Sequence, residues 1–121
     1  MTTAENQPKD RMDVTCAMAT LVSHRRDDQV VITNQGPARE WPKQCSHPLD
    51  FHYIPSAMGA AIPLGLGLAL AQPEREVVVL SGDGSLLMNL GCLVTVVASE
   101  VTNLSIVLID DNDFQTKVLF S

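Results

Sequence analysis

Three short runs of mostly apolar residues stand out along the chain and predict buried strands. They span residues 29–33, 77–81 and 104–109 and are rich in β-branched side chains. Continuous runs of this length are typical of parallel strands that helices cover on both faces. We therefore expect these segments to form the interior of a parallel sheet.

The segments between the strands carry helical patterns. An apolar stripe predicts a helix over 12–22, and shorter patterns predict helices over 38–44, 56–71 and 85–100. The stretch 45–55, which is rich in His and Pro, is predicted to be an irregular connection.

The third predicted helix has clear end signals and an unusual composition. Ser56 occupies the N-cap position, and Pro73 follows the expected end near residue 71. Glycines at 59, 65 and 67 thin one side of this helix. We expect that side to pack closely on the sheet.

The order of helices and strands predicts an α/β domain with a mostly parallel sheet flanked by helices. Residues 1–10 are polar and are expected to form a disordered arm, which leaves residues 11–121 as one domain. Three strands are few for a doubly wound domain. The sheet is therefore expected to lack one or more edge strands and to be incomplete at the C-terminus.

Composition excludes several classes of function. The formal net charge is −6, from 14 acidic and 8 basic residues, and no Lys/Arg cluster is present. This argues against a nucleic-acid surface. The longest apolar stretch, 57–71, is too short to span a bilayer and contains Pro63, so no membrane role is expected. Three cysteines without CxxC spacing indicate reduced thiols and a cytoplasmic protein.

Two polar clusters follow two of the predicted strands. Gly82-Asp83-Gly84 comes after the second strand, and Asp110-Asp111-Asn112 comes after the third. The carboxyl ends of parallel strands meet at one edge of a sheet, about 5 Å apart if the strands are neighbours. Open α/β sheets bind ligands at that edge, and hard oxygen ligands suit Mg²⁺ beside a phosphate.

The run SGDGSLLMNLGCLVTVVASEVTNLSIVLIDDND resembles the cofactor motif of thiamine-diphosphate-dependent enzymes. In that motif GDG is followed, one helix and one strand later, by an Asn or Asp-Asn pair. Here 25 residues separate Gly84 from Asp110. The resemblance covers about residues 12–112. Within the superfamily the chain is most similar to the small thiamine-diphosphate-binding subunits of sulfopyruvate and phosphonopyruvate decarboxylases.

The resemblance implies a magnesium site. Asp83 would be a metal ligand, while Gly82 and Gly84 let the backbone turn sharply beside the diphosphate. Asn112 is the favoured second ligand, with Asp111 as the alternative, because a one-residue shift in the match exchanges them. The alternative interpretation is that Gly82-Asp83-Gly84 forms an ordinary β-turn without a ligand.

Further residues are implied to contact the cofactor. Ser85 would begin the helix whose amides face the phosphates. Met58, followed by Gly59, matches the place of an apolar wedge that bends thiamine, and the backbone carbonyl of Ser56 would accept from its amino group. Met58 could instead be a core filler. The loop that contains Asn34 and Gly36 would approach the diphosphate, and an ordinary turn explains it equally well. These implied cofactor contacts are Asn34, Gly36, Ser56, Met58, Gly59, Gly82, Asp83, Gly84 and Ser85.

The function that follows from the resemblance is one subunit of a 2-oxo acid decarboxylase acting on a small anionic substrate. The family activates thiamine with a glutamate from a separate pyrimidine-binding domain, which 121 residues cannot also contain. We therefore expect no catalytic residue in this chain, a partner domain or subunit that supplies the glutamate, and an oligomer. The chain alone should be inactive.

Two alternatives of other classes remain open on the sequence. The tail from Asp113 departs from the family pattern, which would suit a truncated, non-catalytic α/β remnant. Asp110 and Asp111 could instead serve a flavodoxin-like phosphate-binding or phospho-acceptor module.

Overall fold

The structure is a computed structural model, and it describes residues 13–53, 57–110 and 115–120. Its strands are β1 (Val30–Thr33), β2 (Asp50–His52), β3 (Val77–Gly82), β4 (Leu104–Asp110) and β5 (Gln115–Phe120). Its helices are α1 (Val14–Ser23), α2 (Gly36–Gln44), α3 (Ala61–Ala71), α4 (Asp83–Met88) and α5 (Cys92–Ala98).

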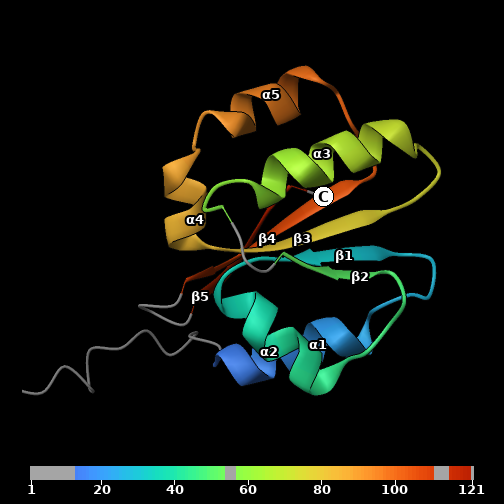
Figure 1. Ribbon diagram of the computed structural model, residues 1–121, viewed down its shortest axis with the longest axis vertical. Helices are drawn as coiled ribbons and strands as arrows, with labels where there is room; N and C mark the ends of the chain where they lie inside the picture. The colour runs from blue at the N-terminus through green and yellow to red at the C-terminus, as the bar shows by residue number, and fades with distance from the viewer. Residues whose placement is uncertain (1–12, 54–56, 111–114, 121) are drawn as a thin grey trace, which may run out of the picture.

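The strands form one sheet in the order β2-β1-β3-β4-β5 (Figure 1). The first four strands are parallel, and β5 runs antiparallel to β4. The predicted α/β class with a mostly parallel sheet is therefore confirmed. The second and third expected strands, β3 and β4, are neighbours, a point that the sequence left open.

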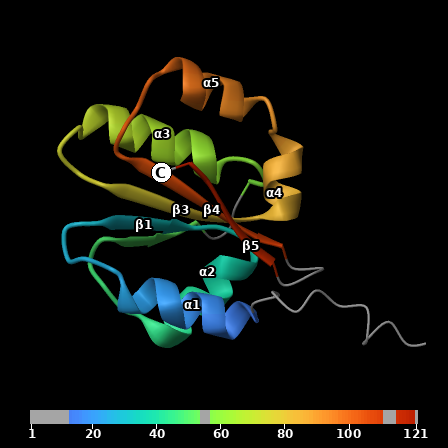
Figure 2. The same cartoon turned by 180° about the vertical axis from the view of Figure 1, so that it is seen from behind.

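Helices cover both faces of the sheet (Figures 1 and 2). Helices α1 and α2 pack on one face, and α3 and α4 pack on the other, with α5 against α3. Alternate residues along each strand serve the two faces. In β1, for example, Ile32 joins the core under α3, whereas Val31 joins the core under α1 and α2.

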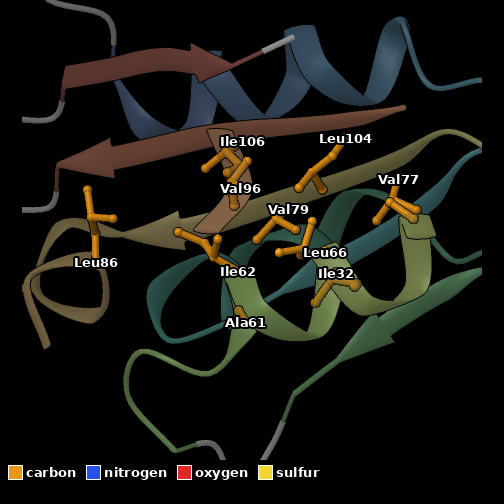
Figure 3. Close-up of a cluster of buried hydrophobic side chains, with 11 residues drawn as sticks. Ile32, Ala61, Ile62, Leu66, Val77, Val79, Leu86, Val96, Leu104 and Ile106 are labelled. Carbon is orange, nitrogen blue, oxygen red and sulfur yellow. The ribbon is translucent and has the colours of Figure 1, made fainter. Parts of the chain in front are cut away.

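The core under α3 is aliphatic. Figure 3 shows side chains of α3, α4 and α5 meeting those of the three central strands. Its buried members are Ile32, Ala61, Ile62, Leu66, Ala69, Val77, Val79, Leu86, Val96, Leu104 and Ile106. The opposite core gathers around Trp41 of α2 and Met18 of α1, which are 2% and 0% exposed.

Two strands were not expected from the sequence. β2 lies within the stretch 45–55 that was predicted to be irregular, and β5 follows the last polar cluster. β2 has only three residues and no apolar run, and its pairing with β1 makes it a strand. Such short edge strands are defined by their neighbour rather than by their own composition.

Two helices also differ from prediction. The segment 85–100 is not one helix, because Asn89 leaves helical geometry at φ −146° and ψ 50° and separates α4 from α5. Helix α3 begins at Ala61 with Ala60 as its N-cap, so the predicted start at Ser56 is wrong. Ser56 itself lies outside the described residues, and residues 57–60 form a turn in which Gly59 has φ +85°.

The glycines of α3 differ in their surroundings. A Cβ on Gly65 would lie 2.4 Å from Cγ2 of Val79, so the helix approaches β3 closely at this point. A Cβ on Gly67 would meet no atom within 4 Å. The predicted close packing on the sheet therefore holds for Gly65 and is wrong for Gly67.

This difference gives a matched pair of variants. Gly65→Ala is expected to lower the free energy of unfolding by about 1–3 kcal/mol, because the methyl group overpacks the interface between α3 and β3. Gly67→Ala is expected to raise it by roughly 0.5–1 kcal/mol, because alanine favours an open helix position. Urea denaturation of the full chain measures both, and equal effects of the two variants would contradict this packing.

In the part of the chain that the structure describes, no helix is both long and apolar enough to cross a membrane.

Candidate cofactor site

The candidate site lies where the strand order reverses. The chain leaves β1 toward β2 on one side, while β3 lies on the other side of β1. Asn34 follows β1 directly, and its N–H donates to the carbonyl of Leu80 in β3 at 3.1 Å. Open α/β sheets bind ligands outside the carboxyl ends of the strands at such a reversal.

The two predicted polar clusters start from paired positions on this edge. Gly82 at the end of β3 pairs with Ile109 of β4, so Asp83 and Asp110 are the next residues of two adjacent parallel strands. The backbone therefore brings the starts of the two clusters to the same edge of the sheet, as the sequence predicted. Asp111 and Asn112 lie outside the described residues, so the second metal ligand stays a prediction.

Asp83 is the first residue of α4 and is partly exposed at the edge of the sheet. Its Oδ1 accepts a hydrogen bond from the N–H of Gly84 at 2.9 Å. It is also the only acidic or basic residue in α3, α4 and α5. No group of three or more His, Cys, Asp or Glu side chains in the described residues could hold a metal. A metal at Asp83 would therefore need further oxygens from a phosphate or from the 110–112 cluster.

A buried polar network joins the segments around Asp83. Asn34 Nδ2 donates to Ser85 Oγ at 3.2 Å, and the N–H of Gly59 donates to the same oxygen at 2.9 Å. Asn34 is fully buried, and Ser85 is 2% exposed. Three segments that are distant in sequence, after β1, before α3 and at the start of α4, therefore converge on one hydroxyl group.

One buried polar atom of this network has no partner. Asn34 Oδ1 is buried and has no partner among the described residues. In this orientation Ser85 accepts two hydrogen bonds, and its own hydrogen still needs an acceptor. If the amide is reversed, Ser85 donates to Asn34, and the amino group of Asn34 needs the acceptor instead. An unpaired buried polar group costs about 1–3 kcal/mol. With the amide reversed, a phosphate oxygen is the kind of acceptor that would pair with the Asn34 amino group.

Met58 lies beside the GDG turn rather than in the core. Its side chain is 47% exposed, and its Cε is 3.6 Å from the position that a Cβ would take on Gly84. The alternative that Met58 is a core filler is therefore wrong. Gly36 begins α2 at the same edge, after Gln35, which has φ +59°.

The sequence analysis assigned no role to two polar residues of this edge. Asn89 Nδ2 donates to the carbonyl of Gly59 at 3.0 Å, and His52 Nδ1 lies 2.6 Å from Thr33 Oγ1. The spacing of Asn89 from Ser85 was a usable signal, because residues four apart share one face of a helix. The pair of His52 and Thr33 comes from the unexpected strand β2.

A second polar cluster lies away from this edge, where β2 begins. Arg25 pairs there with Asp50, and Trp41 Nε1 donates to the same carboxylate at 2.9 Å. Burial and the Asp50 carboxylate raise the pKa of the Cys45 thiol, and Arg25 opposes them. Burial also raises the pKa of Cys92. Both thiols are therefore less ionised at neutral pH than ordinary cysteines, which agrees with a packing role.

Residues 17–116 match the family model described as thiamine pyrophosphate enzyme, C-terminal TPP binding domain. The chain belongs to this family, and the α/β fold described above is consistent with that domain.

Three relatives indicate which enzymes of this family the chain resembles. The chain is 52% identical to sulfopyruvate decarboxylase subunit beta of Methanothermobacter thermautotrophicus over 91 residues. This alignment covers 74% of the present chain and 48% of that protein. It is 44% identical over 86 residues to phosphonopyruvate decarboxylase of Streptomyces viridochromogenes, covering 71% of this chain and 21% of that protein. It is also 32% identical over 111 residues to the large subunit of acetolactate synthase isozyme 2 of Escherichia coli, covering 88% and 20%. The chain thus spans about half the length of the sulfopyruvate decarboxylase subunit.

Proposed function

We propose that this chain binds Mg²⁺ and the diphosphate of thiamine diphosphate as one subunit of a 2-oxo acid decarboxylase. The observation that carries this proposal is the buried side-chain amide of Asn34, which has an unpartnered polar atom beside Ser85 and the GDG turn, at the reversal of strand order. The similarity to sulfopyruvate and phosphonopyruvate decarboxylases supports a small, anionic 2-oxo acid as substrate.

Different residues would contact different parts of the cofactor. Asp83, with Asn112 or Asp111, would hold Mg²⁺, and the network of Asn34 and Ser85 would donate to a diphosphate oxygen. Gly82, Gly84 and Gly36 would let the backbone approach the diphosphate. Met58 and Gly59, with the Ser56 carbonyl, would support the thiamine end. When bound, thiamine diphosphate supplies the electron sink for loss of CO₂, and the chain binds and orients it.

A partner subunit is part of this proposal. Asp83 is the only acidic side chain on α3, α4 and α5, and we expect the activating glutamate to come from another polypeptide. The outer face of α4 and α5 is uncharged and strongly apolar, which supports such an association. Its exposed large side chains are Leu87, Met88, Leu90, Val94 and Val97, which are 52–72% exposed. Two of the relatives above are themselves named as subunits.

Calorimetric titration of the full chain with thiamine diphosphate, in Mg²⁺ and then in EDTA, tests the proposal. Metal-dependent binding is expected, with no binding of thiamine, which lacks the diphosphate. Absence of binding, both alone and with the partner subunit, would favour the non-catalytic remnant.

We also propose a cytoplasmic location, which is supported by the absence of disulfides among Cys16, Cys45 and Cys92.

A further inference from the structure

Gly59 is held through both of its backbone polar groups by one face of α4. Its N–H donates to Ser85 Oγ at 2.9 Å, and its carbonyl accepts from Asn89 Nδ2 at 3.0 Å. Ser85 lies in the first turn of α4, and Asn89 follows its last residue. The two side chains are four residues apart, so they reach the turn 57–60 from the same side.

The fit between this turn and α4 is steric as well as polar. Gly59 has φ +85°, a conformation that side-chain-bearing residues rarely adopt. A Cβ on Gly59 would lie 2.7 Å from Cβ of Asn89. The turn therefore rests directly on the end of α4, and its conformation depends on the position of Asn89.

Met58 immediately precedes Gly59, and its side chain reaches over Gly84. We call the two hydrogen bonds from Ser85 and Asn89 to Gly59 the clamp. The clamp connects two parts of the candidate site, the GDG turn that begins α4 and the turn that carries Met58. We propose that Asn89 is a positioning residue that fixes Met58 against the GDG turn. Its importance for cofactor binding rests on the function proposed above, whereas the clamp itself does not.

Asn89 suits a positioning role because little else in the fold depends on its side chain. Asn89 is exposed and follows the end of α4, so its truncation leaves no cavity in the core. Ser85 would still hold the N–H of Gly59. Loss of Asn89 should therefore loosen the turn 57–60 without unfolding the domain.

Hydrogen–deuterium exchange of the full chain tests the clamp without any cofactor. In Asn89→Ala, deuterium uptake is expected to rise in peptides that cover residues 57–60, while peptides from β3 keep the uptake of the wild type. Leu90→Ala is the matched control, because Leu90 is the neighbouring exposed side chain, and it should leave both regions unchanged. Unchanged uptake at 57–60 in Asn89→Ala, or an equal rise throughout the chain, would overturn the inference.

Two ligands then separate positioning from binding. With Mg²⁺, Asn89→Ala is expected to weaken the binding of thiamine diphosphate roughly three- to tenfold, the value of one hydrogen bond. Met58→Ala should weaken it at least as much, and neither variant should change the binding of inorganic pyrophosphate. The double variant should bind thiamine diphosphate no more weakly than the weaker-binding single variant, because both substitutions act through the side chain of Met58. Equal losses for the two ligands, or additive effects, would contradict the role of Asn89. Failure of the wild type to bind either ligand would overturn the proposed function instead, and the exchange experiment would still decide the clamp.

Discussion

Asp83→Ala is expected to abolish Mg²⁺-dependent binding of thiamine diphosphate, lowering the affinity by at least about 100-fold. Loss of groups that merely orient a metal ligand already costs about 10–100-fold, and Asp83 is proposed to touch the metal itself. Asp83 is also the single acidic or basic residue of α3, α4 and α5, so no neighbour on these helices can replace its carboxylate. Calorimetry with Mg²⁺ and thiamine diphosphate measures the change.

The fold should survive this substitution. Asp83 is partly exposed, and its carboxylate accepts from the N–H of Gly84 next to it. A circular dichroism melt close to that of the wild type is expected. Asp28→Ala is the matched control, because Asp28 is an exposed aspartate outside the site. Retained affinity in Asp83→Ala, or an equal loss in Asp28→Ala, would remove the basis of the proposed metal site.

Asp50→Asn is expected to destabilise the domain by about 3–5 kcal/mol, because it leaves the guanidinium of Arg25 buried without its counter-charge. Arg25 Nη1 lies 2.6 Å from Asp50 Oδ1, and the two side chains are 5% and 2% exposed. Arg25 also donates to the Gln29 carbonyl at 2.9 Å and to His47 Nδ1 at 3.1 Å. The pair therefore connects the chain after α1 to the start of β2, and urea denaturation measures its loss.

Two further variants separate the charge effect from general damage. Arg25→Met combined with Asp50→Asn should be more stable than Asp50→Asn alone, because no unpaired charge remains buried. Asp28→Asn removes an exposed partner of Arg26 and should change stability by less than about 1 kcal/mol. A double variant as unstable as Asp50→Asn would show that shape, rather than charge, governs this cluster.

The strands show where sequence reasoning succeeds and where it stops. The segments 29–33, 77–81 and 104–109 were predictable because a strand buried on both faces must be apolar along its whole length. β2 was not, since three residues that are polar at both ends become a strand only by pairing with β1. Asn89 likewise ends α4 inside a pattern that predicted one continuous helix.

The sequence by itself determined the α/β class, the placement of Gly82-Asp83-Gly84 after a buried strand and the family that this motif indicates. These properties are local, because composition and spacing along a few turns of chain encode them. Only the tertiary structure decided that Asn34 and Gly59 meet on Ser85, and that Asn89 closes on Gly59. Those contacts join residues 26 to 51 positions apart, and folding alone brings such distant polar groups together. Asn34 and Ser85 are buried, so their polar groups need partners within the protein or from a ligand because water no longer reaches them.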